Sequence, residues 1–554
     1  MSVDTDNAAF QDALNLIQYT RQSVFLTGKA GTGKSTFLRY VCEHTKKKHV
    51  VLAPTGIAAI NAGGSTMHSF FKLPFYPLLP DDPNLSLQRG RIHEFFKYTK
   101  PHRKLLEQIE LVIIDEISMV RADIIDAIDR ILRVYSHNLR EPFGGKQLLL
   151  VGDVFQLEPV VKNDEREILN RFYPTPYFFS ARVFGQIDLV SIELQKVYRQ
   201  TDPVFVSVLD HIRTNTAGAA DLQLLNTRYG SQIEESEADM YITLATRRDT
   251  VDSINEKKLA ELPGEPITFE GVIEGDFPES SLPTSQELVL KPGAQIIFIK
   301  NDFDRRWVNG TIGVIAGIDE EEETIYVITD DGKECDVKLE SWRNIRYHYN
   351  EKTKEIEEEV LGSFTQYPIR LAWAITVHKS QGLTFSRVVI DFTGGVFAGG
   401  QAYVALSRCT SLDGIQLKKP VNRADVFVRP EIVNFAGRFN NRQAIDKALK
   451  QAQADVQYAA ASRAFDKGDM EECLEQFFRA IHSRYDIEKP VPRRLIRRKL
   501  GIINTLKEQN KKLKEQMREQ QERIRQYAHE YLLMGNECIT QAHDVRAALA
   551  NYDK

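Results

Sequence analysis

The 554-residue sequence is poor in cysteine and tryptophan, with five of the first and three of the second. The cysteines are scattered without the paired spacing of a zinc site or a disulfide framework, at Cys42, Cys335, Cys409, Cys473 and Cys538. No run of about 18 apolar residues occurs, and the acidic segment at 1–6 lacks the apolar stretch of a signal peptide. These absences predict a cytoplasmic protein without a membrane span, in a reducing compartment.

An excess of positive charge is also missing. The 72 lysines and arginines are outnumbered by 77 acidic residues, so the formal net charge is -5. The charge balance therefore argues mildly against nucleic-acid binding, for which a broadly basic domain is the usual electrostatic sign. We expect any surface that holds nucleic acid to be a local groove in which basic residues gather.

Residues 23–180 alternate between short aliphatic runs and amphipathic helical patterns, which predicts a parallel sheet covered on both faces. The expected strands are Ser23–Thr27, Val50–Leu52, Leu111–Ile114 and Leu148–Val151. Four prolines between Pro74 and Pro83 interrupt this rhythm, because proline continues neither a helix nor a central strand. We therefore expect an inserted excursion at about 71–97.

A second alternating stretch runs from about 189 to 415 and contains a different kind of segment at 311–366. There, Thr324–Thr329 alternates between apolar and polar residues, turns at Asp330–Gly332 and resumes through Cys335–Leu339. This pattern is typical of a β-hairpin. The segment is expected to form a small all-β insertion.

No strand pattern remains beyond about residue 426. Between 491 and 530 the apolar residues follow 3-4 spacing, with Asn510 and Gln520 as polar breaks, at Ile503, Leu506, Leu513, Met517, Ile524 and Tyr531. This pattern fits either a coiled coil that binds a partner or a long surface helix packed against its own neighbours. Fragments on either side, around Gly468 and Gly535, resemble tetratricopeptide repeats.

The segment Gly28–Ser35 matches the P-loop pattern and lies between an apolar strand and a helical run. In that setting backbone N–H groups converge on phosphate oxygens at the start of the helix. Lys34 is expected to reach the β- and γ-phosphates of ATP, and the Ser35 hydroxyl to ligate Mg²⁺. The predicted nucleotide contacts are Gly28, Gly31, Thr32, Gly33, Lys34, Ser35 and Thr36.

Two acids, Asp115 and Glu116, end the expected strand at 111–114, about 80 residues after the P-loop. Asp115 is expected to hold the Mg²⁺ shell, together with Ser35. Glu116 is expected to orient and polarise the attacking water.

Further runs resemble the motifs of superfamily-1 helicases and follow the order of that family. They are Asp115–Met119, Gly152–Pro159, Leu194–Gln200, Trp307–Gly313, Ala374–Thr384 and Gln401–Arg408. Between the first two, Glu141–Gln147 resembles the end of a signature of the PIF-type (petite integration frequency) DNA helicases. These helicases form part of the RecD-like superfamily-1B branch, and the resemblance covers about residues 20–415.

The resemblance implies roles around the nucleotide. Gln156 would contact the γ-phosphate and couple it to the interface between lobes, and Gln381 and Gly382 would border the nucleotide. Arg199 and Arg408 would be two arginines that the second lobe points at the phosphates, where cations stabilise the charge of phosphoryl transfer.

A glutamine upstream of the P-loop contacts adenine in related helicases. Gln11 is our first candidate and Gln18 the second, although either residue also fits a solvated helix face. Thr384 stands where many superfamily-1 enzymes have a glutamate for the ribose, so the resemblance leaves selectivity for the sugar open.

The same resemblance implies a track for a nucleic-acid strand, on which backbone N–H groups and hydroxyls bind phosphates. The first lobe would contribute Thr55, Gly56, Thr66 and His68, and the second Thr376, His378 and Lys379. A packed, hydrogen-bonded histidine is the alternative for His68 and for His378. Phe75 and Tyr76, in the proline-rich excursion, are candidates for stacking on bases or splitting a duplex, whereas Phe70 and Phe71 fit the core.

The sequence thus predicts an α/β fold of two RecA-like P-loop lobes with small insertions and an all-α tail. The expected divisions are a first lobe at 1–185 with a wedge at 71–97, a second lobe at 186–430 with an SH3-like insertion at 311–366, and a helical tail at 431–554. The tail is expected to bind a protein partner or to self-associate.

By resemblance, the function is that of an ATP- and Mg²⁺-dependent DNA helicase that moves 5′ to 3′ on single-stranded DNA. Tailed and forked duplexes and G-quadruplexes are the expected substrates, in genome maintenance at a bacterial nucleoid. Two alternatives stay open. One is an RNA-stimulated helicase or ATPase, since phosphate contacts do not distinguish the sugars. The other is a scaffold that acts through the tail.

Overall fold

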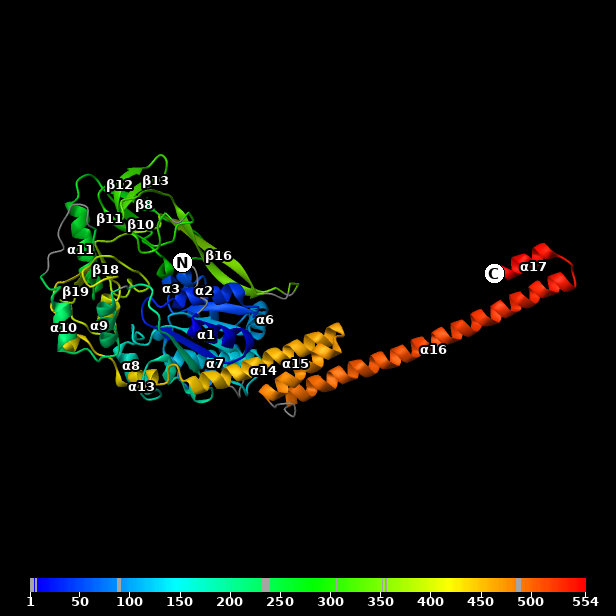
Figure 1. Cartoon of the computed structure of the whole chain (residues 1–554). Coiled ribbons are helices and arrows are strands. Elements are labelled where there is room, and N and C mark those ends of the chain that lie inside the picture. The colour runs from blue at the N-terminus through cyan, green and yellow to red at the C-terminus, as the bar shows by residue number, and fades with distance from the viewer. Residues whose placement is uncertain are drawn as a thin grey trace. The chain divides into compact units, whose positions relative to one another are not determined.

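The computed structural model divides into two compact units, Met1–Asp455 and Val456–Lys554, each of which is described by itself (Figure 1). The residues that the structure describes are 4, 7–86, 91–200, 202–230, 240–304, 306–350, 352–353, 356–484 and 490–554. Among them, no helix is both long and apolar enough to cross a membrane.

The first lobe is built on a six-stranded sheet in which every neighbouring pair is parallel. Its strand order is β3 (Ser65–Thr66), β2 (His49–Ala53), β4 (Leu111–Ile114), β5 (Gln147–Val151), β1 (Val24–Gly28) and β6 (Val190–Leu194). This sheet confirms the parallel arrangement expected for the four aliphatic runs.

Helices cover both faces of this sheet, because alternate strand residues point to opposite sides. Phe25 of β1 joins one core and its neighbours Val24 and Leu26 join the other. The second of these cores packs against α1 (Ala8–Tyr19) and α2 (Lys34–His44). The core that holds Phe25 packs against α4 (Met67–Phe71), α6 (Lys100–Gln108) and α7 (Ala122–Tyr135).

The last strand of this sheet corrects the expected boundary between the lobes at 185/186. β6 pairs with β1 along its whole length, from Val24 opposite Val190 to Gly28 opposite Leu194. The first lobe therefore extends at least to Leu194. An edge strand that arrives after a long connection carries no sequence signal for the sheet it will join.

The proline-rich excursion is partly anchored to the first lobe. It contains η1 (Pro83–Leu85) and α5 (Arg91–Phe95), and its Leu78, Leu85 and Ile92 are buried in the first-lobe core. Phe75 and Tyr76 lie on its outer side, with 85% and 52% of their surface exposed. Phe70 and Phe71 are buried, as expected.

The second lobe has a smaller parallel sheet, with the order β18 (Ala374–Thr376), β7 (Ile242–Ala245), β19 (Val388–Asp391) and β20 (Ile415–Leu417). One face packs against α9 (Pro203–Arg213), α10 (Ala219–Asn226) and α12 (Gln401–Leu406). Val251 of α11 (Arg248–Glu261) packs on Ala245 and Ala374 of the sheet.

The β insertion between β7 and β18 is larger than the expected 311–366. The hairpin of β13 (Thr324–Thr329) and β14 (Glu334–Val337) is confirmed. It belongs to a five-stranded antiparallel sheet completed by β12 (Ile312–Asp319), β11 (Gln295–Phe298) and β17 (Ile369–Leu371). Strands β11 and β17 lie outside the expected limits. They join the sheet by pairing with residues that are distant in the sequence, and the hairpin pattern does not contain this information.

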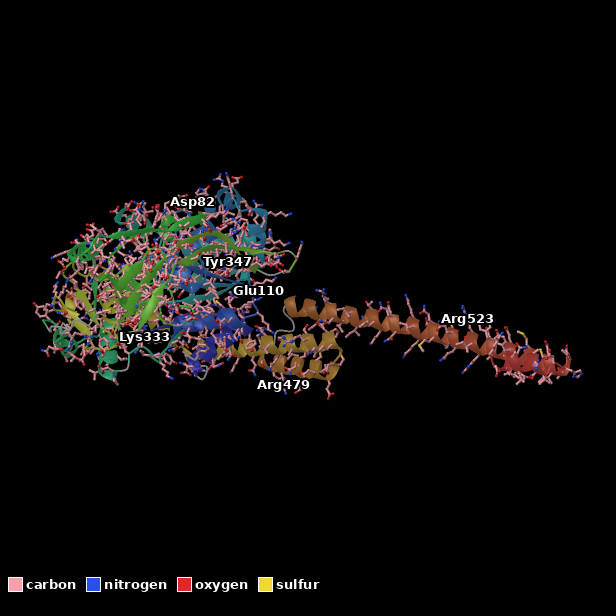
Figure 2. The ribbon with its side chains drawn as sticks, turned by 90° about the horizontal axis from the view of Figure 1, so that it is seen from above. Asp82, Glu110, Lys333, Tyr347, Arg479 and Arg523 are labelled. Carbon is pink, nitrogen blue, oxygen red and sulfur yellow. The ribbon has the colours of Figure 1, made fainter. Side chains whose placement is uncertain are left out.

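A second group of antiparallel strands reaches from the insertion to the first lobe. β15 (Glu340–Tyr349) and β16 (Ile356–Gln366) form a long hairpin that also pairs with β9 (Val272–Gly275), and a separate pair joins β8 (Ile267–Glu270) to β10 (Glu287–Leu290). Tyr347, labelled in Figure 2, is buried in the first-lobe core and its hydroxyl lies 3.5 Å from the carbonyl oxygen of Gly63.

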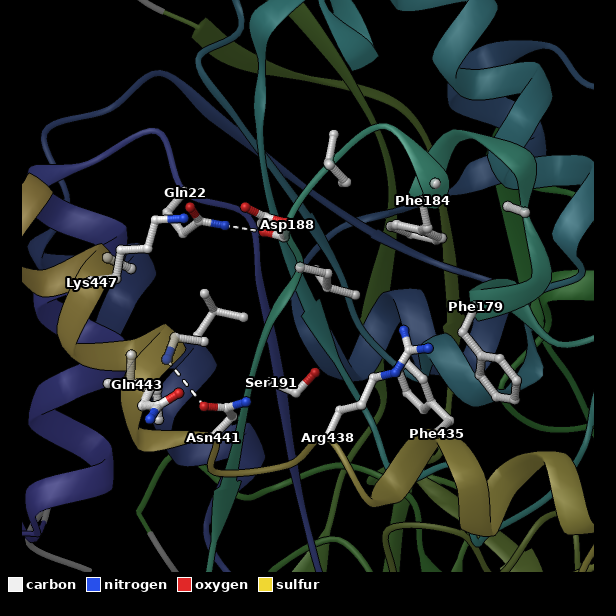
Figure 3. A pocket seen from close by; sticks show the side chains of 18 residues that line it. Gln22, Phe179, Phe184, Asp188, Ser191, Phe435, Arg438, Asn441, Gln443 and Lys447 are labelled. Atoms are coloured by element: carbon white, nitrogen blue, oxygen red, sulfur yellow. Dashed lines mark hydrogen bonds between the residues drawn. The ribbon is translucent and has the colours of Figure 1, made fainter.

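After the second lobe the chain returns to the first, which corrects the expected start of the tail at 431. Phe435 of α13 (Pro430–Ala436) stacks on Phe179 at 4.4 Å between ring centroids (Figure 3). Ile445 and Ala448 of α14 (Arg442–Lys467) join the core beneath α1 and α2. Residues 431–455 thus belong to the first compact unit, and a purely helical composition concealed this.

The second unit is all α, as predicted for the tail. The end of α14 pairs with α15 (Met470–Ser483) across the turn at Gly468, and the ring of Tyr458 meets that of Phe477 at 6.0 Å. α16 (Pro490–Thr540) is one helix of 51 residues, and α17 (Val545–Tyr552) folds back on its end. Every residue from 504 to 530 of α16 is exposed, so no described residue of the second unit packs on this stretch.

Candidate nucleotide site and strand track

The nucleotide motifs lie together because three neighbouring strands of the first sheet run in the same direction. β1 ends at the P-loop, β4 ends at Asp115 and Glu116, and β5 ends just before Asp153. Since the strands are parallel, their carboxyl ends share one edge of the sheet, where ligands bind in open α/β folds.

The P-loop needs glycine at the positions where the sequence supplies it. Gly31 and Gly33 have φ of 78° and 88°, a region that residues with a Cβ rarely adopt. A Cβ on Gly31 would lie 2.3 Å from Cβ of Arg199, so the loop and the segment after β6 approach in a way that only glycine permits. The helix α2 begins directly after this loop, with Lys34, Ser35 and Thr36 in its first turn.

Lys34 lies over the loop, and its Nζ donates to the carbonyl oxygens of Gly28 at 2.7 Å and Lys29 at 3.0 Å. Burial lowers its pKa, although the nearby carboxylates of Asp153 and Glu116 oppose this shift. An ammonium that has lost water in this way interacts strongly with phosphate. The Ser35 hydroxyl and the Asp115 carboxylate are the hard oxygen donors that Mg²⁺ prefers, so these residues fit the ion.

The two acids after β4 are held differently from each other. The backbone N–H of Glu116 donates to the Asp115 carboxylate at 2.9 Å, and burial raises the pKa of Asp115. Glu116 itself has a left-handed backbone, with φ 49° and ψ 42°. Burial, followed by the charge of Asp115, raises its pKa to about 7. A carboxylate with this pKa is suited to accept a proton near neutral pH.

A hydrogen-bonded chain joins Glu116 to the second lobe. The amide of Gln381 donates to Oε2 of Glu116 at 2.9 Å and to Oε1 of Gln156 at 3.3 Å. Gln156 in turn lies 3.4 Å from a carboxylate oxygen of Asp153. A residue of the second lobe therefore bridges two residues of the first that follow different strands.

Arg213, which the sequence did not single out, closes this chain. Its guanidinium contacts Asp153 at 3.1 Å and Glu193 at 2.9 Å, and it lies 4.5 Å from the ring centroid of Phe155. Burial opposes the charged form, but Asp153 outweighs it and raises the pKa of Arg213 above its ordinary value. At the end of the amphipathic helix α9, an arginine looks like a solvated residue, so its role has no sequence signal.

Tyr403 makes a further contact that the sequence does not reveal. Its hydroxyl accepts a hydrogen bond from the P-loop N–H of Ala30 at 2.9 Å. Because Tyr403 lies on α12, this bond joins the second lobe directly to the loop expected to hold phosphate.

The two expected arginines lie together but come from different places. Arg199 follows β6 of the first sheet, and its guanidinium donates to the carbonyl oxygen of Ser407 at 3.4 Å. Arg408, at the end of α12, is 2% exposed and donates to the carbonyls of Val404, Ser380 and Leu383. Burial lowers the pKa of both, that of Arg408 to about 9 with the charge of Arg199 as second cause.

Other predicted nucleotide contacts are less closely tied to this cluster. Gly382 is exposed with φ 83°, next to Gln381. Gln11 and Gln18 lie half-buried on α1, ahead of the P-loop strand. Thr32 is buried and its hydroxyl donates to the Lys29 carbonyl at 2.9 Å, which stabilises the loop from inside.

The residues expected along the strand track lie at or just after the carboxyl ends of β2, β3 and β18. Thr55 and Thr66 accept the backbone N–H of Ala58 and Ser69 and so cap α3 (Gly56–Ala62) and α4. In the second lobe, Thr376 accepts from the N–H of Lys379 at 3.2 Å.

The two histidines of this track are half-buried, whereas Phe75 and Lys379 are exposed. His68 stacks on Phe75 at 5.0 Å, with an interplanar angle of 9°, so the excursion continues the surface of α4. Burial lowers the pKa of His68, of His378 and of Lys379. The two histidines are therefore favoured in the neutral form, which suits hydrogen bonding or stacking better than ion pairing.

The β insertion contacts the first lobe beside the expected track. A Cβ on Gly56 would lie 2.6 Å from the Ser281 hydroxyl, and the Asn309 amide lies 3.5 Å from Oδ1 of Asn61. The insertion of the second lobe thus touches α3 of the first, next to two residues expected to hold the strand.

Comparisons with known proteins agree with this geometry. Residues 4–215 match the family described as PIF1-like helicase. The ATP-dependent DNA helicase Pif1 of Campylobacter jejuni is 34% identical over 412 residues, which cover 71% of this chain and 88% of that protein. The chain belongs to the PIF1-like helicases.

Solved structures of the family resemble this one. Bacteroides sp. Pif1 in complex with ADP-AlF4 has 41% sequence identity and a TM-score of 0.71, over 78% of this chain and 96% of that one. Bacteroides Pif1 bound to ssDNA has 40% identity and a TM-score of 0.57, over 80% and 99%. As a PIF1-like helicase, the chain is an ATP-hydrolysing DNA helicase with a RecA-like α/β core, and this confirms the predicted fold class, enzyme class and use of ATP.

Proposed function

We propose that this PIF1-like helicase steps 5′ to 3′ along single-stranded DNA by opening and closing its lobes once for each ATP. The observation that supports coupling between ATP and lobe closure is the bridge from Gln381 to Glu116 and Gln156, whereas the direction is proposed by analogy with the family. The residue that activates water and the residue that senses the γ-phosphate then share one partner from the second lobe. Hydrolysis would break the same contact that holds the lobes together.

In this proposal the P-loop N–H groups and Lys34 bind the phosphates. Ser35 and Asp115 hold Mg²⁺, which supplies positive charge beside the transferring phosphoryl group when it is bound. Glu116 accepts a proton from the attacking water, and its raised pKa makes it a base matched to neutral pH. Gln156 reports the state of the γ-phosphate to Gln381 and thus to the second lobe.

Arg199 and Arg408 stabilise the charge that develops on the phosphoryl group. Both guanidiniums are largely removed from water, and the pKa of each is lowered by burial, so each gains strongly from a nearby anion. Gly28, Gly31, Thr32, Gly33 and Thr36 shape the loop, Gly382 borders the nucleotide, and Gln11 contacts the adenine.

The strand lies across both lobes, on phosphate contacts from Thr55, Gly56, Thr66, Thr376 and Lys379. The histidines at 68 and 378 pack beside it in neutral form. Phe75 and Tyr76 meet the duplex as a wedge, because they are exposed at the outer side of the excursion. The β insertion, expected to be SH3-like, covers the strand beside α3.

Tailed and forked duplexes and G-quadruplexes are the substrates that we propose, by analogy with the family, with action at the nucleoid. The tail, from 456 onwards, is proposed as a surface for a protein partner or for self-association rather than as part of the motor.

Strand displacement tests the direction. A duplex with a 5′ single-stranded tail should be unwound in ATP and Mg²⁺, and one with only a 3′ tail should stay paired. Preference for the 3′ tail would overturn the direction and leave the ATPase unaffected. Stimulation of ATP turnover by oligo-dT should exceed stimulation by oligo-U.

Lys34→Ala serves as the matched inactive variant. It should abolish ATP turnover and leave binding of a labelled single strand within about twofold, because the proposed track does not include the P-loop. Loss of both would mean that the two sites overlap or that the variant is unfolded, which circular dichroism would show.

A further inference from the structure

The middle of α16 is exposed along its whole length and also carries an apolar face, a combination that is unusual on the surface of a monomer. Every residue from 504 to 530 is exposed, a length of about 40 Å at 1.5 Å per residue. In Figure 2, side chains project from both sides of the helix around Arg523. Helices of proteins owe most of their stability to the packing of one apolar face. This helix has such a face, and within the unit Val456–Lys554 no described residue packs on it between residues 504 and 530.

The exposed face is a continuous seam at 3-4 spacing. We define the α16 seam as Ile503, Leu506, Asn510, Leu513, Met517, Gln520, Ile524 and Tyr527. Leu506, Leu513 and Met517 are each 56–57% exposed, and Ile524 is 65% exposed. Apolar side chains rarely form a contiguous exposed strip in a monomer, whereas strips of this spacing are the contact surface of coiled coils.

The same face is already used for helix packing at its end. Beyond Tyr527 the same side of the helix passes through Tyr531, Gly535 and Cys538, at steps of four, four and three residues, and α17 packs on the last two. A Cβ on Gly535 would lie 2.3 Å from the ring of Tyr552, and Asn551 lies 3.8 Å from Sγ of Cys538. The face therefore accepts a helix in close contact where its own chain supplies one, and the seam is the part that α17 does not reach.

The two polar seam residues restrict what the partner helix can be. A buried amide costs free energy unless it is hydrogen-bonded, so Asn510 and Gln520 need amides opposite them. A second α16 supplies these in either direction. If the two helices run antiparallel, with residue numbers in each contact adding to 1030, Asn510 meets Gln520. The remaining layers are then wholly apolar: Ile503 with Tyr527, Leu506 with Ile524, and Leu513 with Met517.

Charge decides between the two directions. Residues 496–514 contain seven basic residues and one acid, whereas residues 515–534 contain four acids and three basic residues. Parallel helices would align the basic half of each chain with itself. Antiparallel helices align it with the half that carries the acids, which lowers the repulsion between helices that lie within a Debye length of each other.

We propose that the α16 seam is covered by a second copy of this chain, with the two α16 helices antiparallel and Asn510 of each opposite Gln520 of the other. The interface does not depend on the proposed direction of the motor. The paired α16 helices would link two helicase chains, so one complex would contain two motors.

The mass of the full chain in solution, from light scattering or sedimentation at micromolar concentration, gives the first test. The unsubstituted chain should be a dimer, and Leu513→Glu with Met517→Glu should be a monomer, because the central layers would then bury carboxylates. The matched control is Asn504→Glu with Gln526→Glu, which adds the same charge on the outer face of α16 and should stay dimeric. A monomeric unsubstituted chain, or equal loss of dimer in both variants, would overturn the proposal.

Disulfide trapping tests the direction. Asn510→Cys and Gln520→Cys chains, oxidised separately, should give no new cross-link, whereas their mixture should give a dimer linked from 510 to 520. The unsubstituted chain is the control for the five native cysteines, and peptide mass spectrometry identifies the linked positions. Cross-links from 510 to 510 and from 520 to 520, with none from 510 to 520 in the mixture, mean parallel helices and overturn the antiparallel arrangement.

Lys514 provides a third test that does not disturb the seam. Near the dyad of the antiparallel arrangement it lies beside Lys514 of the partner subunit, whereas in a parallel arrangement it faces Gln509 of the partner subunit. Lys514→Gln should therefore tighten the antiparallel dimer several-fold at low salt and by less at high salt. No change, or a weaker dimer, contradicts the arrangement.

Discussion

The nucleotide site and the α16 seam depart from ordinary burial in opposite ways. At the site, charged groups are removed from water, with Arg408 2% exposed and Glu116 shifted to a pKa of about 7. Along the seam, apolar side chains remain in water, with more than half of the surface of Leu506, Leu513 and Met517 exposed. Both arrangements raise the free energy of the isolated chain. The difference teaches that the first is compensated by a ligand that carries charge and the second by a partner that carries apolar surface.

The largest effect on ATP turnover is expected from the loss of an arginine at the nucleotide site. Arg408→Ala is expected to lower kcat by about 10³-fold or more, with a smaller change in nucleotide affinity, because a cation that acts in the transition state affects binding less. Steady-state ATP turnover with DNA and a fluorescent nucleotide titration measure the two quantities. A change in nucleotide affinity alone would remove Arg408 from the transition state and make it a binding residue.

Glu116→Gln tests whether a buried charge at the nucleotide site lowers stability, because it should reduce ATP turnover and raise the free energy of unfolding. Turnover should fall by about 10²–10⁴-fold. The folded pKa of about 7 lies above the unfolded value near 4.5, so stability is lost as pH rises between these values, and the carboxylate is unfavourable at pH 8. The amide should therefore raise the free energy of unfolding at pH 8 by roughly 1–3 kcal/mol.

Two measurements check Glu116→Gln. Denaturant unfolding at pH 8 and at pH 5 should show the gain at the higher pH and little at the lower. Turnover of the unsubstituted chain should rise with pH through about 7, and the variant should lack this rise. An equal stability change at both pH values would exclude the charge of Glu116 as its cause.

Arg213→Met tests whether the buried ion pairs behind the site hold the lobes together. It leaves Asp153 buried without its cation and should cost about 3–5 kcal/mol of unfolding free energy. The double variant with Asp153→Asn should lose clearly less than the sum of the single variants. Simple additivity would mean that the two side chains do not interact in solution.

Truncation should give the smallest effect on turnover, and it separates the nucleotide site from the α16 seam. A chain that ends at 455 keeps every nucleotide and strand residue, so its DNA-stimulated ATPase should stay within about twofold, while the dimer is lost. A chain that ends at 430 also loses Ile432 and Ile445 from the core, and its Tm should fall by on the order of 10 °C. Calorimetry and ATP turnover of both chains check this.

The sequence predicts which nucleotide motifs lie at one edge of the sheet, because the motifs are local. Each expected residue follows a strand, and a parallel sheet places the ends of its strands along one edge, so Lys34, Asp115 and Glu116 had to meet. Arg213 and Tyr403 could not be found in this way, since their partners Asp153 and Ala30 lie 60 and 373 residues away. Contacts of that kind depend on how two lobes close.

The boundaries were harder to predict for a related reason. β6 and α13 are ordinary elements in sequence, and only the core that they join identifies their lobe. For α16, the spacing of the seam predicted the helix and its apolar face. The exposure of residues 504–530, on which the proposed partner depends, could not be predicted from that spacing.

The attachment of β6 to the first sheet has a consequence for the timing of the ATP cycle. Arg199 lies five residues beyond a strand that is paired with the P-loop strand, and the neighbouring Tyr198 N–H donates to the Gly31 carbonyl at 2.8 Å. Arg408 is carried by α12 of the other lobe. When the lobes separate, we expect Arg408 to leave with its helix and Arg199 to stay beside the loop. Arg199 would then contact bound nucleotide whether the lobes are open or closed, whereas Arg408 would contact it only when they are closed. The enzyme would therefore retain ATP when the lobes separate and the DNA strand is released.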